Sequence, residues 1–204
     1  MMKGLLLKEF YVASRTCRSI LFVAVVFFAL SFFGRDSQFF FLYPLMMVSL
    51  FPVTLLSYDE RDGWDKYSLT LPCTRAQLVS AKYLIGLIFG GAVFLLAELL
   101  LAVRLFLNGA FDAGAFLSLS SALLLLGLLG PSLLMPFTFK FGSEKGRMAY
   151  YLVIVLLFAA IALLAGMGFY TYLEKFSWLV IGAAVLLYLG SWRLSIFFYE
   201  KREL

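Results

Sequence analysis

Residues 83–107 read YLIGLIFGGAVFLLAELLLAVRLFL, and within this stretch only Glu98 and Arg104 carry a charge. A helix needs about 20 predominantly apolar residues to cross roughly 30 Å of hydrocarbon, so the stretch predicts a membrane-spanning helix. The whole chain agrees, because 63% of its 204 residues are hydrophobic and only 14% are charged. Soluble domains carry about 25% charged residues. We therefore expect an all-α, polytopic membrane protein with one transmembrane domain over residues 1–204.

The remaining apolar stretches raise the expected number of spans to six, since the charges gather in short islands between them. The six predicted spans cover residues of about 19–33, 39–57, 83–107, 115–139, 148–170 and 176–198. Residues 1–18 precede the first span, and a helical wheel places an apolar stripe on them through Leu6, Phe10, Ala13 and Cys17. Such a stripe is typical of a helix that lies in the membrane interface. The alternative is that these residues form the first turns of one long span.

The distribution of Lys and Arg predicts the orientation. If the N-terminus is cytoplasmic, all of them except Arg35, Arg104 and Lys175 fall in cytoplasmic segments. Cytoplasmic loops hold the excess of basic residues in membrane proteins, so both termini are expected inside, as an even number of spans requires. The formal net charge of +5 is then explained by contact with anionic lipid, and no nucleic acid partner is needed.

One cytoplasmic segment is unusually long and charged: residues 58–82, YDERDGWDKYSLTLPCTRAQLVSAK. Connections in compact bundles are usually a few residues long, which favours a docking element here over a plain solvated connection. Aromatic side chains inside a charged rim are typical of protein contacts. The charged and aromatic candidates for such a contact in the first half of this segment are Asp59, Glu60, Arg61, Trp64, Asp65 and Tyr67. Pro72 predicts a break, and Thr74 with Gln77 predicts a capping box that starts the helix into residues 83–107.

Missing residue types restrict the chemistry of this chain. It contains no histidine, which excludes His general bases and His-ligated zinc or haem. No GxxxxGK[ST] loop occurs; the nearest stretch, FGSEKGR at 141–147, has its glycines one residue too close. We expect no enzyme activity, metal or cofactor in this chain, and any ATP must bind a separate subunit.

Over nearly its whole length the sequence resembles the short bacterial membrane subunits of ABC-2 type ABC transporters. The resemblance rests on the opening MKGLLLKEF, the passage YDERDGWDKYSLTLPCTRAQLVSAKYL and the closing YEKREL. It implies six spans, an interfacial N-terminal helix, and a coupling helix in residues 58–82 that docks on an ATP-binding subunit. Leu71, Pro72 and Arg75 join the docking set on this ground. The resemblance also implies two ATPase subunits holding ATP and Mg²⁺, a second membrane subunit, a bacterial inner membrane and export.

Several residues inside the predicted spans are candidates for a transport pathway. Glu98 is an acidic residue well within a span, and such a carboxylate either binds a cation or proton or is hydrogen-bonded structurally. The hydroxyl candidates are Ser49, Thr54, Ser118 and Ser121; hydroxyls also bond their own helix carbonyls. Gly86, Gly90 and Gly91 allow close helix contact, within the subunit or at a dimer interface. Pro44, Pro52, Pro131 and Pro136 predict kinks, which are either hinges or static.

These observations together predict the permease subunit of an ATP-driven exporter. The alternative is a membrane immunity or regulatory scaffold that binds a partner at the same segment. Dependence on a cognate ATPase separates the two interpretations.

Overall fold

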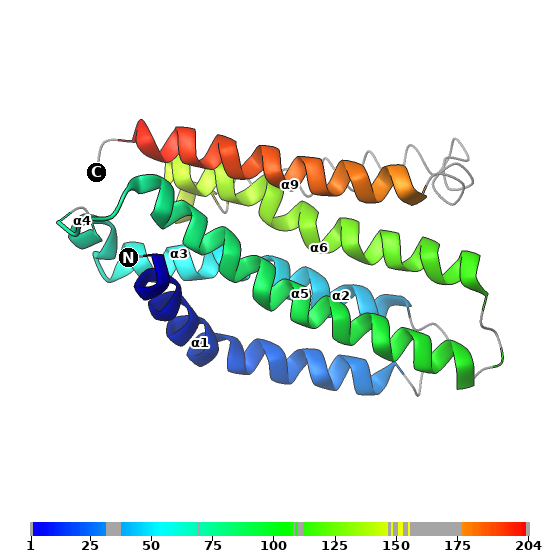
Figure 1. Cartoon of the computed structure of the whole chain (residues 1–204). Helices are drawn as coiled ribbons and strands as arrows, with labels where there is room; N and C mark the ends of the chain where they lie inside the picture. The colour runs from blue at the N-terminus through cyan, green and yellow to red at the C-terminus, as the bar shows by residue number, and fades with distance from the viewer. Residues whose placement is uncertain are drawn as a thin grey trace.

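The computed structural model describes residues 2–31, 38–68, 70–107, 109, 112–146, 148, 151–152, 155 and 177–202. Within these ranges the secondary structure is helical and no strand occurs, so the all-α prediction is confirmed for this part of the chain. The helices run lengthwise beside one another as a bundle (Figure 1). Their bounds are α1 Met2–Leu30, α2 Gln38–Ser49, α3 Phe51–Arg61, α4 Trp64–Ser68, α5 Arg75–Leu107, α6 Ala113–Phe141 and α9 Ser177–Glu200.

Four helical stretches are long and apolar enough to cross a membrane. They are Phe40–Arg61, Arg75–Leu107, Phe116–Phe141 and Trp178–Glu200, and they overlap the second, third, fourth and sixth predicted spans. α1 is a fifth candidate, because Met2–Arg15 and Arg18–Leu30 pass the same test together with a bend of 56° between them. The predicted span 148–170 lies for the most part outside the described residues. The count of six therefore stays a prediction.

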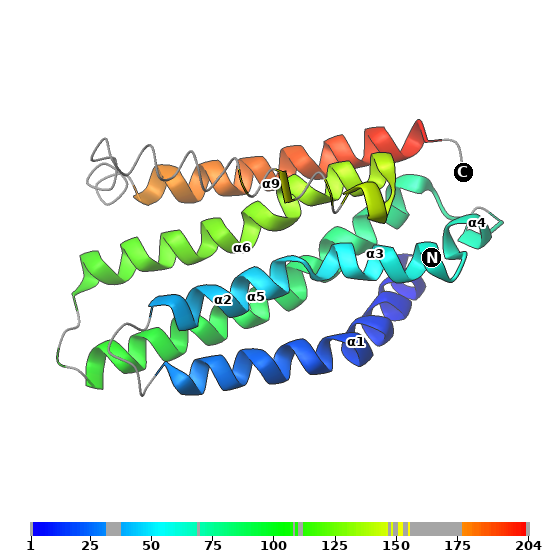
Figure 2. The same ribbon diagram turned by 180° about the vertical axis from the view of Figure 1, so that it is seen from behind.

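Pro52 explains why α2 and α3 are two helices on one nearly straight path (Figure 2). It occupies one of the first two positions of α3, where its missing N–H removes no bond that the helix needs. Pro52 has no backbone N–H to donate to the carbonyl one turn earlier in the chain, and α2 therefore ends at Ser49. The second span is thus continuous in direction but interrupted in its hydrogen bonding.

The described residues form three apolar centres, the smallest around Phe51 and Ile85, beneath a lipid-like exterior. Phe28, Phe41 and Ala97 are buried in the centre between α1, α2 and α5, while Val79 and Phe139 belong to the one nearer α4. In the most apolar windows of α5, α6 and α9 only 22% to 28% of the residues are buried. The remaining faces carry large exposed apolar side chains, as a surface in contact with hydrocarbon requires.

A row of polar bonds joins α5 to α9. The hydroxyl of Tyr83 is 2.7 Å from the hydroxyls of both Ser191 and Ser195, and the Tyr188 hydroxyl donates to the Tyr83 carbonyl oxygen at 2.9 Å. The Trp192 ring stacks on that of Tyr83 with a centroid distance of 5.4 Å. These contacts fix the register of the two helices. The start of α1, the last turn of α9 and α4 lie at the same end of the bundle (Figure 1).

Candidate functional site

The segment between α3 and α5 begins with a tight reversal and ends with a helix cap. Gly63 has φ of +69°, a left-handed conformation that glycine adopts without a steric penalty, and it separates α3 from α4. At the other end Thr74 Oγ1 accepts from the Gln77 N–H, and Gln77 Oε1 accepts from the Thr74 N–H, both at 3.3 Å. The predicted capping box is confirmed, and α5 starts at the next residue, Arg75.

A network of two lysines and two carboxylates holds this segment to the bundle. Lys82 Nζ lies 2.7 Å from Glu9 Oε2 and also bonds Asp59 Oδ2. Lys8 Nζ lies 2.6 Å from Asp59 Oδ1 and 3.0 Å from Glu9 Oε1. Glu9, Asp59 and Lys82 are only 2%, 5% and 4% exposed. The four charges balance, so each carboxylate is paired with lysine, and α1, α3 and α5 meet at one point.

Two residues of α4 lie beside this network. The Trp64 ring is half-buried beneath Lys8, whose Nζ is 4.2 Å from the ring centroid, a cation–π contact. Asp65 is buried, and this burial raises the pKa of its carboxyl from 3.8 to about 6. The nearby carboxylates of Glu60 and Asp59 act in the same direction, while Arg202 and Lys82 lower the pKa.

A second set of contacts ties the segment to the last turn of α9 and to the end of α6. Glu60 accepts from Arg202 at 3.2 Å and from the backbone N–H of Ser143 at 2.7 Å. Arg75 Nη1 donates to the carbonyl oxygens of Tyr199, Glu200 and Arg202 at 3.1, 2.9 and 2.8 Å. A guanidinium at the C-terminus of a helix satisfies carbonyls that lack a helical partner and matches the negative end of the helix dipole.

The predicted docking residues consequently divide into two groups. Asp59, Glu60, Asp65 and Arg75 are turned into the contacts above, with Trp64 partly covered. Arg61, Tyr67 and Pro72 are exposed, with Leu71 half-buried between them, and Tyr67 is 58% exposed. The first group determines where the segment sits, and the second is what a partner can touch. Figure 1 places α4 at the very end of the bundle.

Sequence reasoning missed the part of α1 that enters this site. The buried side chains of its first half are Leu5, Glu9 and Ala13, whereas Leu6 and Phe10 of the predicted stripe are half-buried and exposed, respectively, and the membrane-interface role of that stripe stays a prediction. Glu9 turns inward because its carboxylate is paired there with Lys82 and Lys8. The spacing of Leu5, Glu9 and Ala13 at intervals of four, with an acidic residue in the middle, was the available signal.

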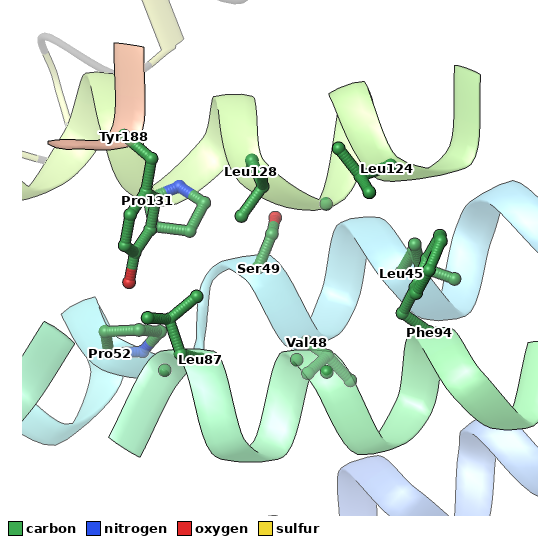
Figure 3. A pocket seen from close by; sticks show the side chains of 14 residues that line it. Leu45, Val48, Ser49, Pro52, Leu87, Phe94, Leu124, Leu128, Pro131 and Tyr188 are labelled. Carbon is green, nitrogen blue, oxygen red and sulfur yellow. The ribbon is translucent and has the colours of Figure 1, made fainter. Parts of the chain in front are cut away.

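An apolar cavity of about 220 Å³ lies between α2, α3, α5, α6 and α9 (Figure 3). Gly86, Gly90 and Gly91 form its α5 wall and Ser49 lies opposite. A Cβ atom on Gly86 would stand 2.6 Å from Pro52 Cγ, so this glycine permits close contact of α5 with α3. A Cβ atom on Gly90 or Gly91 would meet nothing within 4 Å. These two glycines therefore border space and make no close contact with another helix among the described residues.

Three of the four predicted hydroxyl candidates are bonded to their own helices. Ser49 donates to the Met46 carbonyl at 2.7 Å, Thr54 to that of Leu50 at 3.2 Å, and Ser121 to that of Ser118 at 2.8 Å. Such bonds satisfy a hydroxyl in an apolar setting without a ligand. Of the four, Ser49 lines the cavity described above.

Glu98 lies elsewhere on α5, half-buried and outside the lining of that cavity. The Ser120 hydroxyl of α6 bonds its carboxyl. Its Oε1 atom is buried without a hydrogen-bond partner in the part of the chain that the structure describes. Among the described residues this carboxyl therefore has one structural hydrogen-bond partner, and one of its two oxygens has none.

Long apolar helices, a lipid-like exterior and a charged segment at one end define a multi-pass membrane protein. A family model described as ABC-2 family transporter protein matches residues 4–200. The chain therefore belongs to the ABC-2 family of transporter proteins, as the sequence resemblance predicted. Comparison with curated proteins and with solved structures gives no match.

Proposed function

We propose that this chain is the permease subunit of an ATP-driven exporter and that the segment from Asp59 to Arg75 docks on a separate ATP-binding subunit. The observation that carries the proposal is the contrast within this segment. Asp59 is held by ion pairs to Lys8 of α1 and Lys82 of α5, and Arg75 donates to carbonyl oxygens at the end of α9. Arg61, Tyr67 and Pro72, in contrast, are exposed at the end of the bundle. A docking helix has to be rigidly attached on one side and accessible on the other.

The proposed route of coupling follows the ion pairs. A push on α4 moves Asp59, and through Lys82 it reaches α5, whose later turns border the cavity. Glu9 carries the same displacement to α1. Because the charges are buried and paired, separating them is unfavourable, and the three helix ends are expected to move as one body.

In the working assembly we expect two copies of the ATP-binding subunit, with ATP and Mg²⁺ bound there, and two membrane subunits in a bacterial inner membrane. The second membrane subunit is a copy of this chain or a related one. Export as the direction of transport follows from the family resemblance.

Co-purification in mild detergent tests the docking surface. The tagged chain is purified from its own host, and an ATP-binding subunit is sought by mass spectrometry and by ATPase activity. Tyr67→Ala is the sharpest variant, since Tyr67 is exposed while Trp64 also supports Lys8. Trp178→Ala is the matched control, because Trp178 is 73% exposed at the opposite end of the bundle.

The expected result is an ATPase that co-purifies with the wild type and with Trp178→Ala and is lost from Tyr67→Ala. A folded chain that never brings down an ATPase would favour the scaffold interpretation. An ATPase retained equally by both variants would place the docking surface elsewhere.

A further inference from the structure

The cavity between the spans is long and narrow. On α5 its wall extends from Gly86 to Phe94, which is about 12 Å along a helix. Figure 3 shows Pro52 and Tyr188 at one end and Leu45 and Phe94 at the other. Its volume of about 220 Å³ is larger than the roughly 150 Å³ in which an apolar protein cavity holds benzene. The shape suits a linear chain better than a compact molecule.

The lining is almost wholly apolar. Among the described residues no charged side chain borders the cavity, and the hydroxyl groups of its two polar side chains, Ser49 and Tyr188, already donate to the carbonyls of Met46 and Tyr83. A water molecule needs two or more polar partners to be held in a buried site. This lining favours an apolar ligand over water, and hydrocarbon is the ligand chemistry that fits it.

The surroundings determine how such a ligand reaches the cavity. Leu87 borders it and is 38% exposed on the outer face of α5, in a stretch that is otherwise apolar. That face meets the hydrocarbon of the bilayer. The space next to Gly90 and Gly91, where a Cβ atom would touch nothing, keeps the path along α5 clear.

We propose that this cavity binds a single hydrocarbon chain of an amphiphile, which enters laterally from the bilayer. The chain belongs to a membrane lipid or to a lipophilic cargo. Binding itself follows from the lining and access, whereas the cargo interpretation rests on the proposed function.

Photolabelling of the full chain in liposomes tests the proposal. The probe is a phosphatidylcholine with a diazirine on one acyl chain, and labelled residues are mapped by mass spectrometry. The filled variant is Gly90→Leu, because Gly90 shares the helix face of Gly86 and Phe94 in the cavity wall and its Cβ position is open. Gly182→Leu is the matched control, since Gly182 is an exposed helical glycine of α9 that also has nothing within 4 Å.

The expected result is labelling of Phe94, Leu124 and Leu128 that falls several-fold in the filled variant and is unchanged in Gly182→Leu. Labelling of the outward-facing Leu95 and Leu99 should persist in all three proteins. Lining residues that are never labelled, or that stay labelled in the filled variant, would overturn the proposal. If the filled variant does not fold, competition by dodecane in the wild-type protein tests the proposal instead. Labelling of the lining should then fall, whereas labelling of Leu95 should not.

A further arm distinguishes the two sources of the chain. In the complex with the ATPase, ATP turnover should deplete the label at the lining if the chain is cargo, and should leave it constant if a lipid resides there. Both outcomes support a hydrocarbon site. The labelling needs no ATPase, so a failure of the proposed function leaves it intact.

Discussion

Lys82 on α5 and Glu9 on α1 form a buried ion pair with an Nζ to Oε2 distance of 2.7 Å, although 73 positions separate them in the chain. The same ammonium bonds Asp59 on α3. A single side chain therefore joins the first half of α1, the end of α3 and the start of α5. No local sequence rule relates these three residues, and their meeting is a property of the folded bundle.

Removal of this ammonium should destabilise the protein strongly. Lys82→Met keeps the length of the side chain but leaves the Glu9 and Asp59 carboxylates buried with less compensation. Loss of one partner of a buried pair costs about 3 to 5 kcal/mol, which corresponds to a fall of roughly 10 °C in Tm for a chain of this size. Thermal unfolding in detergent measures it.

Lys66→Met is the control, because Lys66 is an exposed lysine of α4 and surface changes stay within about 0.5 kcal/mol. Adding Glu9→Gln to Lys82→Met should recover part of the loss, since one uncompensated charge disappears. Equal Tm values for the two lysine variants would show that the network contributes nothing to stability.

Asp65 should make stability depend on pH in a defined window. Burial raises the pKa of this carboxyl from 3.8 to about 6, so between these values the folded protein keeps a proton that the unfolded chain has released. Stability then rises as the pH falls through the window and is lower above it. Asp65→Asn removes the buried charge and should raise Tm at neutral pH, with the gain shrinking below about pH 5.

Asp62→Asn is the matched control, because Asp62 is exposed in the same segment. Its Tm difference from the wild type should be small and independent of pH. The pKa shift makes the range of about pH 4 to 7 the decisive one. If the Tm difference for Asp65→Asn did not change over this range, the result would contradict a buried titrating carboxyl.

The helices were predictable where local rules decide them. Apolar composition alone places α5 in the membrane, and the Thr74 and Gln77 pair sets its start, because both effects act over a few residues. The buried face of α1 was not predictable in the same way. Glu9 is inside only because Lys82 and Asp59 reach the same place from distant parts of the chain.

In the candidate site, too, local patterns predicted some features and tertiary contacts determine the rest. Charge and aromatic content identify residues 58–82 as unusual, but they do not tell an exposed contact from a buried support. Arg75 and Tyr67 look alike as docking residues in the sequence, yet Arg75 caps α9 and Tyr67 faces outward. The partners of Arg75 lie more than 120 residues later in the chain, so no local pattern could reveal its role.

Arg75 should control the order of the last turn of α9. Arg75→Ala removes the donor to three carbonyl oxygens, and hydrogen bonds from charged groups contribute about 1.5 to 3 kcal/mol. Amide exchange in the last turn of α9 should therefore rise by about tenfold or more, since roughly 1.4 kcal/mol corresponds to a factor of ten. Hydrogen–deuterium exchange by mass spectrometry measures it.

Two further variants separate this role from a general effect of charge. Arg61→Ala removes an exposed arginine of the same segment and should leave exchange in α9 unchanged. Arg75→Lys keeps the charge but not the planar arrangement of donors, and an intermediate rate is expected. If Arg75→Ala and Arg61→Ala exchanged alike, the cap would have no role in holding α9.

Two glycines on one face of α5 should respond oppositely to the same change. In Gly86→Ala the new methyl group would stand 2.6 Å from Pro52 Cγ, and a proline ring cannot swing away. α5 must then move off α3, and such overpacking costs about 1 to 3 kcal/mol. In Gly90→Ala the methyl group enters open space, while helix propensity favours alanine by up to about 1 kcal/mol. Tm should therefore fall for Gly86→Ala and stay level or rise for Gly90→Ala. A fall of equal size in both would mean that the cavity beside Gly90 is closed in solution, because only contact with a neighbouring group could make an added methyl unfavourable there.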